Sequence, residues 1–334
     1  MLNLTLKQLE TAEFRLYEGN PVIRCFGASP VVADPSVVVP EDAPDGKWHL
    51  FAHTLTGVHG FVSDDGISFA HTGKVVARAM RPDIKKIKDG FVLLYERLQP
   101  LPARAASLAG GTWKSEIYAV KSHDLISFSE PYKVLGFDRD FEKVGKRGFS
   151  LSNPFLTESD DGFVLYYSSG LTYVPDCKFS EPTFICRAVS AFPDRDFVKD
   201  SAPLIVPDPD SKLFNLCCGC LKVYRLADGY AGIQNGIYRE NGKSRSAIQL
   251  LRSDDGKKFE FVKTLLSPCI PDNGSRWMAQ FVYASHLVRT GDELRLYFNA
   301  RNTAFILTGK EHIGFAYASL GMCRTSSQPA FADA

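Results

Sequence analysis

Carboxylate side chains stand at the ends of several short apolar segments in this sequence, where they are available for chemistry. Asp34 follows one apolar segment, Asp83 precedes another, and Glu96 ends the apolar run 91–95. Carboxyl groups divide acid and base roles when their surroundings separate their pKa values. Other polar or aromatic residues mark equivalent segment ends, and these are Arg81, His53, Asn153, Ser169, Gln234, Asn235, Trp277, Gln280, Asn299 and Arg301. Because amides and guanidinium groups bind hydroxyls and a Trp ring stacks on a sugar face, this set predicts a site for a polyhydroxylated ligand.

The eight cysteines predict neither a metal site nor a disulfide framework. They do not form the two separated C-x-x-C pairs that are typical of a zinc site. The cluster 217–220 holds three of them, but neighbouring residues in a strand point to opposite faces and no second group of ligands lies nearby. We interpret these cysteines as small buried residues, and we expect reduced thiols, no metal and no cofactor.

The composition argues against nucleic-acid and membrane partners. The 39 Lys and Arg residues nearly balance the 38 Asp and Glu residues, which gives a net charge of +1. The first ten residues lack the apolar stretch of a signal peptide, and no stretch reaches the roughly 18 apolar residues of a membrane span. We therefore expect a soluble, cytoplasmic protein that acts on a small molecule, with an oligomeric state that the sequence leaves open.

A repeated pattern dominates the rest of the chain. An apolar segment ending in Ser, usually followed by a turn and an aromatic residue, recurs at intervals of 59 to 68 residues. The marker residues of the five copies are Ser63, Ser122, Ser190, Ser253 and Ser319. Five copies at a nearly constant interval predict five similar structural units.

A second series of turns runs in phase with the first. Asp-Gly or Gly-Asp pairs precede apolar strands near positions 45, 89, 161, 228 and 291. Asp-Gly favours a tight hairpin because Gly adopts positive φ without steric cost. Each unit therefore predicts four antiparallel strands, and strands such as 91–95 and 163–167 are apolar enough to be buried on both faces. Five such sheets arranged radially predict an all-β, five-bladed propeller.

The last repeat lacks its outer strand, because the pattern ends at Ser319. The segment Glu13–Tyr17 precedes the first unit and can supply that strand, which would close the ring and protect an exposed edge. We therefore predict a single domain over residues 1–320 and a flexible tail over 321–334. In each blade the start of strand one and the end of strand two would then meet at the hub, where the polar residues named above lie.

At this point the sequence resembles a known group of proteins. The segments 32–37 (Val-Ala-Asp-Pro-Ser-Val), 81–84 (Arg-Pro-Asp-Ile) and 153–155 (Asn-Pro-Phe), with the hairpins that follow the last two, resemble the five-bladed propeller glycoside hydrolases of families 43, 32 and 117. The resemblance implies that Asp34 is the general base or nucleophile of blade one. The second Asp of the group is replaced by Asn153, and the Glu that serves as general acid on blade four has no match in 214–223.

Glycoside hydrolysis needs two carboxyl groups, one that protonates the leaving oxygen and one that activates water or attacks carbon. We predict Asp34 as base, Glu96 as acid and Asp83 as the residue that modulates them. The sequence does not decide whether Glu96 and Asp83 exchange roles, and a structural ion pair between Asp83 and Arg81 is an alternative. The leading prediction is thus an enzyme that acts on a small glycoside or furanoside.

Other interpretations remain open at this stage. Phosphate could attack in place of water, as in the propeller phosphorylases that the chain also resembles, and Arg81, Arg301, Lys222 or Arg147 could hold it. A transferase or an eliminating enzyme would also fit the missing carboxylates. His286 could replace the missing acid, but its place late in strand one favours a structural role. A non-catalytic carbohydrate-binding propeller would keep the polar hub without facing carboxyl groups.

Overall fold

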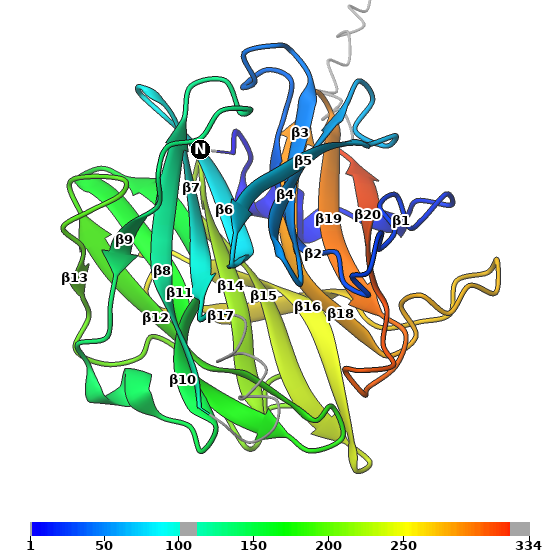
Figure 1. Ribbon diagram of the computed structural model, residues 1–334. Helices are drawn as coiled ribbons and strands as arrows, with labels where there is room; N and C mark the ends of the chain where they lie inside the picture. Colours follow the sequence, from blue (N-terminus) through cyan, green and yellow to red (C-terminus); the bar gives the residue numbers. More distant parts are fainter. Residues whose placement is uncertain (1, 101–111, 321–334) are drawn as a thin grey trace, which may run out of the picture.

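The computed structural model describes residues 2–100 and 112–320, and these are almost entirely β (Figure 1). The predicted tail 321–334 lies outside the described residues. Near the N-terminus a short helix, α1 (Leu6–Thr11), begins at a capping box in which Thr5 and Gln8 bond each other's backbone N–H groups. A single 3-10 turn, η1 (Asp140–Lys143), follows the second group of strands. No helix among the described residues is long and apolar enough to cross a membrane.

The strands of the described residues fall into consecutive antiparallel groups of four. Group 1 contains β2 (Ala33–Val38), β3 (Trp48–Thr54), β4 (Gly57–Ser63) and β5 (Ala70–Ala77). Group 2 contains β6 (Ala79–Ile87), β7 (Gly90–Leu98), β8 (Trp113–Ser122) and β9 (Tyr132–Leu135). Group 3 contains β10 (Gly148–Ser159), β11 (Gly162–Val174), β12 (Phe179–Ser190) and β13 (Val198–Lys199).

Group 4 contains β14 (Cys217–Leu226), β15 (Gly229–Glu240), β16 (Lys243–Ser253) and β17 (Glu260–Leu266). Group 5 contains β18 (Phe281–Thr290), β19 (Glu293–Arg301), β20 (Glu311–Ser319) and β1 (Arg15–Leu16). Groups 2 and 3 are joined into one larger sheet, because β8 pairs in parallel with the start of β10. The pairing of β1 with β20 is the one predicted for the segment Glu13–Tyr17, and the two strands lie side by side in Figure 1.

The repeated Ser-containing turns are built by the same hydrogen bonds in three groups. After β4, the Ser63 hydroxyl accepts a bond from the backbone N–H of Gly66, and the Asp65 carboxylate accepts bonds from the next two N–H groups. The third turn residue has positive φ, which explains Gly at positions 66 and 256. The same bonds recur around Ser122 and Ser253, so the sequence repeat reports a structural repeat.

The apolar core is divided into layers between neighbouring groups. In β3, Leu50 packs in a cluster with Tyr297 of group 5, whereas the adjacent Phe51 packs in a cluster with Leu93 of group 2. Comparable clusters lie between groups 2 and 3, 3 and 4, and 4 and 5. The strands are therefore buried on both faces, as their apolar runs predicted.

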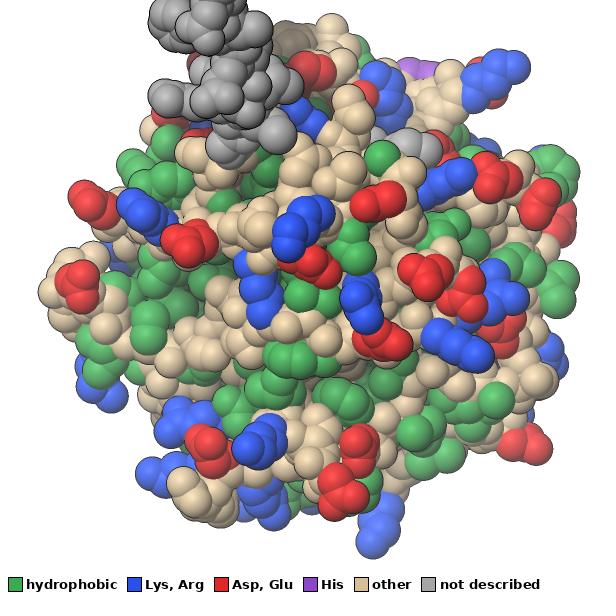
Figure 2. Space-filling view, turned by 180° about the vertical axis from the view of Figure 1, so that it is seen from behind, with side chains coloured by type: hydrophobic (Ala, Val, Ile, Leu, Met, Phe, Trp, Pro, Cys, Tyr) green, Lys and Arg blue, Asp and Glu red, His purple; other side chains and the backbone are tan. Residues whose placement is uncertain are grey.

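The first strands of the groups contact one another in chain order. β2 contacts β6, β6 contacts β10, β10 contacts β14, β14 contacts β18, and β18 contacts β2. Side chains connect neighbouring groups as well: the Thr157 hydroxyl of β10 donates to the Val223 carbonyl of β14 at 2.5 Å, and the Asn235 amide of β15 donates to the Val282 carbonyl of β18 at 3.0 Å. On the face shown in Figure 2, basic and acidic side chains are interspersed, in keeping with the balanced composition.

Candidate functional site

Each first strand carries a β-bulge near its beginning, and the bulges aim side chains at a shared cavity. The pairing register shifts between Ala33 and Ser36, Met80 and Asp83, Ser152 and Phe155, Cys217 and Cys220, and Val282 and Ser285. In four strands the bulged residue takes positive φ, and these residues are Asp34 (55°), Arg81 (51°), Asn153 (48°) and Gly219 (66°). A non-glycine residue in this conformation is strained, and such strain is concentrated at functional sites.

All four bulged residues line one cavity of about 360 Å³, which we call the hub cavity. Of the residues predicted from the sequence, it is lined by Asp34, His53, Arg81, Asn153, Asn235, Asn299 and Arg301. They come from every group of strands, so the fold gathers residues up to 267 positions apart. The hub cavity also contains two carboxylates that the sequence analysis did not predict, Glu181 and Glu311.

Asp34 is held in its ionised form by its neighbours. Burial alone would raise its pKa, but the hydrogen bond from His53 and the positive charges of His53, Arg81 and Lys222 hold the pKa below its usual value. The Nδ1 atom of His53 lies 3.1 Å from Asp34 Oδ2, and the Asp34 backbone N–H donates to Asn299 Oδ1 at 3.1 Å. An ionised carboxylate held in this way can accept a proton or attack carbon.

Glu181, in β12, has the opposite electrostatic environment. Burial raises the pKa of Glu181 to about 7. The charges of Arg81 and Arg301 lower this pKa, and those of Glu311 and Asp34 raise it. Glu181 lines the hub cavity but is only 8% exposed, so it is largely desolvated. A carboxyl group with this pKa is about half protonated at neutral pH, so it can donate a proton there.

Glu311, at the start of β20, is fixed by two neighbours on β19. Asn299 Nδ2 donates to Glu311 Oε2 at 2.9 Å, and Arg301 Nη1 lies 3.3 Å from Oε1. Arg301 also donates to the Tyr283 hydroxyl at 2.7 Å. These contacts fix the position of the Glu311 carboxylate, which contributes to the raised pKa of Glu181.

Both missed carboxylates lie at the starts of the third strands of their groups. In an antiparallel sheet, the start of strand three lies at the same end as the start of strand one and the end of strand two. The site residues predicted from the sequence lie near the first two of these positions, and none lies at the third. The signals were present as Glu181-Pro182 at the start of β12 and as Glu311 opposite Arg301.

The structure places Glu96 outside the hub cavity, which corrects its predicted position. Glu96 is fully buried, pairs with the Arg81 guanidinium and accepts a hydrogen bond of 2.5 Å from the Ser115 hydroxyl. It does not line the cavity. Because strand side chains alternate between faces, Glu96 points to the side of β7 on which Arg81 and Ser115 lie, and it orients Arg81 from behind.

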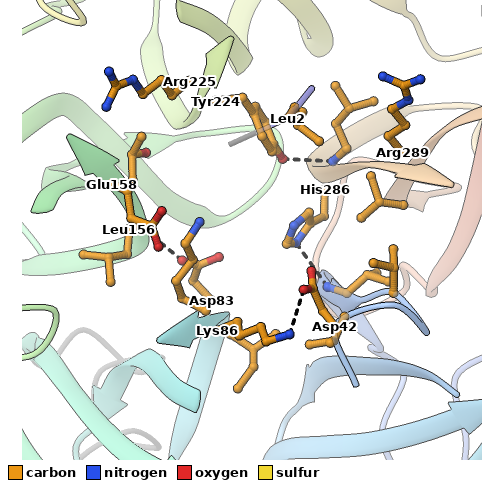
Figure 3. Close-up of a pocket in the computed structure, with 18 of the residues that line it drawn as sticks. Leu2, Asp42, Asp83, Lys86, Leu156, Glu158, Tyr224, Arg225, His286 and Arg289 are labelled. Atoms are coloured by element: carbon orange, nitrogen blue, oxygen red, sulfur yellow. Dashed lines mark hydrogen bonds and ion pairs between the residues drawn. The ribbon is translucent and has the colours of Figure 1, made fainter. Parts of the chain in front are cut away.

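Asp83 also lies outside the hub cavity, in a second cavity of about 910 Å³ formed by the later halves of the first strands (Figure 3). We call this second space the far cavity. The Asp83 carboxylate accepts a hydrogen bond from the Leu156 backbone N–H at 2.9 Å and one from the Ser36 hydroxyl at 3.4 Å. Burial raises its pKa to about 6. The proposed pair with Arg81 is not formed, since Arg81 pairs with Glu96, and Asp83 instead connects β6 to β10 and β2.

Four predicted binding residues likewise do not line the hub cavity. Ser169 is fully buried beside Cys186, and Gln234 donates to the Cys218 carbonyl at 3.1 Å. Trp277 stacks on Phe298 within the core, with ring centroids 5.6 Å apart. Gln280 donates to the Ser244 carbonyl at 2.9 Å. These side chains lie near the ends of their strands, but each points into the packing between groups of strands.

His286 lies in the far cavity, in agreement with its place late in β18. Its Nδ1 accepts a bond from the Val37 backbone N–H at 3.1 Å, and burial with the nearby Lys222 and Lys85 charges holds its pKa well below the usual value. All seven cysteines in the described residues are free thiols. Within residues 2–100 and 112–320, no group of three His, Cys, Asp or Glu side chains is arranged to hold a metal ion.

No protein-family model and no curated protein matches the sequence. The fold, however, is similar to that of several solved structures. One is an N-acetylgalactosamine deacetylase from F. plautii in complex with blood group B trisaccharide, 14% identical, with a TM-score of 0.65 over 92% of this chain and 95% of that one.

A second solved structure belongs to the GH130 family of mannoside phosphorylases, which contains glycoside hydrolases that target β-1,2 mannosidic linkages in Candida mannan. It is 14% identical, with a TM-score of 0.64 over 100% of this chain and 99% of that one. A third is a thermostable family-43 glycoside hydrolase, 14% identical, with a TM-score of 0.62 over 89% and 91% of the two chains. These similarities confirm the propeller-type fold that the resemblance in the sequence implied. At 14% identity they concern the fold alone.

Proposed function

We propose that this chain is a sugar-processing enzyme that acts at a glycosidic carbon inside the hub cavity. The observation that carries the proposal is a pair of carboxyl groups in one cavity whose surroundings separate their proton affinities. Asp34 is held ionised by His53, Arg81 and Lys222, while burial raises the pKa of Glu181 to about 7. Titratable groups whose environments move their pKa values apart are the pattern expected of a base and an acid.

The proposed reaction assigns one step to each carboxyl group. Glu181 transfers its proton to the leaving oxygen as the bond from that oxygen to the sugar carbon breaks. Asp34 takes a proton from the attacking water as the new carbon–oxygen bond forms. Alternatively, Asp34 attacks the carbon itself, and a water molecule then breaks the bond between Asp34 and the sugar and releases the product. The Asn153, Asn235 and Asn299 side chains line the same cavity and can bind sugar hydroxyls. Glu181 thus takes the role that the sequence analysis gave to Glu96.

We further infer that the five groups of strands form a five-bladed propeller closed by β1. Three observations support this inference: the first strands contact one another in order and β18 contacts β2, apolar clusters separate neighbouring groups, and β1 pairs with β20. A ring places the bulges of all first strands around one axis, where the hub cavity lies.

Phosphate in place of water is the second candidate for the attacking group. Arg81 and Arg301 both line the hub cavity, which favours an anion there. Each guanidinium is already paired, Arg81 with Glu96 and Arg301 with Glu311, so we place water first. Of the other cations considered from the sequence, Lys222 does not line the hub cavity, and Arg147 lines a smaller space beside it.

A panel of aryl glycosides, assayed with and without inorganic phosphate, tests the proposal. The wild type should release the aryl group from at least one glycoside, and Asp34→Asn should lose about 10² to 10⁴-fold of that rate. Asp42→Asn, which removes an exposed carboxylate at the far cavity, is the matched control and should keep full activity. If turnover requires phosphate, phosphate rather than water is the attacking group. If the rate is unchanged in Asp34→Asn, Asp34 has no part in the mechanism. A non-catalytic sugar-binding propeller would bind ligands without turning over any of them.

A further inference from the structure

The hub cavity continues into a smaller space that has a different character. This space, of about 50 Å³, shares Arg81, Trp113 and Phe179 with the hub cavity and is otherwise lined by residues including Arg147, Tyr173 and Lys178. We call it the side cavity. It lies against the long hairpin of β11 and β12, which extends beyond Ser169 and its partner Phe184 toward residues 174–179. A negative group on a ligand in the hub cavity can therefore reach into the side cavity, which has room for a carboxylate or a sulfate but not for a sugar ring.

The walls of the side cavity present aromatic rings in fixed orientations. Trp113 and Phe179 meet edge to face, with ring centroids 6.5 Å apart and planes at 79°. The indole N–H of Trp113 donates to the Ser115 hydroxyl at 3.1 Å, and the same hydroxyl donates to Glu96, which pairs with Arg81. This chain of bonds holds Trp113 and Arg81 in place. Aromatic planes of this kind bind the faces of sugar rings.

The charge of the side cavity is positive, in contrast to the hub cavity. The Arg147 guanidinium lies 3.9 Å from the centroid of the Tyr173 ring, which orients it. Among the described residues, no carboxylate lies within ion-pair distance of Arg147 or Lys178. The carboxylates Asp34, Glu181 and Glu311 are all in the hub cavity. Two cations without carboxylate partners beside aromatic rings are suited to a sugar that carries a negative group.

We propose that the side cavity holds the carboxylate or sulfate of an anionic sugar unit, whose ring lies beside Trp113 and Phe179 at the junction with the hub cavity, next to the sugar whose bond is cleaved. This proposal rests on the proposed function and names its substrate class. Arg147 and Lys178 bind the negative group, and Trp113 and Phe179 bind the ring. The neutral amides of the hub cavity bind the neighbouring sugar.

Binding measurements separate this proposal from the proposed function, because they do not depend on turnover. Isothermal titration calorimetry would measure the affinity of the Asp34→Asn variant for each ligand. The ligands are trisaccharides of galacturonic, glucuronic and mannuronic acid, their neutral counterparts, and sulfated counterparts. We expect at least one anionic ligand to bind about tenfold more tightly than its neutral counterpart, the range of one charge-assisted contact. The preference should shrink in 0.5 M salt, because Arg147 and Lys178 are exposed and salt screens exposed charges.

The double variant Arg147→Gln/Lys178→Gln should lose this preference. The control Lys146→Gln should keep it, because Lys146 is an exposed neighbour of Arg147 that does not line the side cavity. Circular dichroism and the melting temperature would establish that each variant is folded. A preference for carboxylate or for sulfate supports the proposal and identifies the group. Equal binding of every anionic ligand and its neutral counterpart, or a preference that persists in the double variant, overturns it, whether or not the enzyme turns over a glycoside.

Discussion

Replacing Glu181 with Gln keeps the size of the side chain but removes the proton that the proposed mechanism transfers. Burial raises the pKa of Glu181 to about 7, so roughly nine-tenths of the molecules carry this proton at pH 6 and roughly one-tenth at pH 8. Activity that needs the protonated acid should therefore fall about tenfold between these pH values. The sign follows from the role, because an acid is active below its pKa.

The assay is kcat/KM for an aryl glycoside between pH 4 and 9. The wild type should lose activity on the basic side with a midpoint near pH 7. Glu181→Gln should lose about 10² to 10⁴-fold at pH 6 and should no longer show this midpoint. The loss should be much smaller with a dinitrophenyl leaving group, which departs without a proton. Glu158→Gln, a carboxylate of the far cavity, is the matched control.

Two results would refute this reasoning. One is a Glu181→Gln enzyme that still loses activity near pH 7, since the midpoint would then belong to another group. The other is an equal loss with good and poor leaving groups, since a residue that donates no proton is insensitive to that difference.

Three further predictions follow from buried groups elsewhere in the fold. Lys222→Met should raise the pKa of Asp34, because the lysine charge helps to lower it, and the acidic limb of kcat/KM should move to higher pH; an unmoved limb would contradict this. The pKa of Asp83 is raised from 3.8 to about 6 in the fold, so its carboxyl favours the native state when protonated, and stability should fall by about 3 kcal/mol as pH rises from about 4 to 6. Urea denaturation of Asp83→Asn should lack this part of the pH dependence, and identical pH profiles would contradict the raised pKa. Leu9→Ala should cost about 2–5 kcal/mol in the same assay, because Leu9 of α1 is fully buried in the core, and a loss below about 1 kcal/mol would show that α1 is not docked in solution.

The five repeated units could be predicted from the sequence because short-range chemistry produces them. Asp-Gly turns and the Ser-Asp turns around Ser63, Ser122 and Ser253 depend on residues within five positions, so their pattern is visible in the chain. The pairing of β1 with β20 could also be predicted, because an unpaired edge requires a strand. Asp34 was identified because it opens a first strand, where the bulge directs it to the hub cavity.

Which other carboxylates line the hub cavity is determined only by the tertiary structure. A strand alternates its side chains between two faces, and a single bulge changes the face on which a residue lies. Glu96 and Asp83 therefore lie outside the hub cavity, whereas Glu181 lines it. The pKa of Glu181 depends on burial and on charges from three different groups of strands, among them Asp34 and Arg81. Electrostatic interactions act through space rather than along the chain, so the opposite pKa shifts of Asp34 and Glu181 could be recognised only once the fold had brought these residues together.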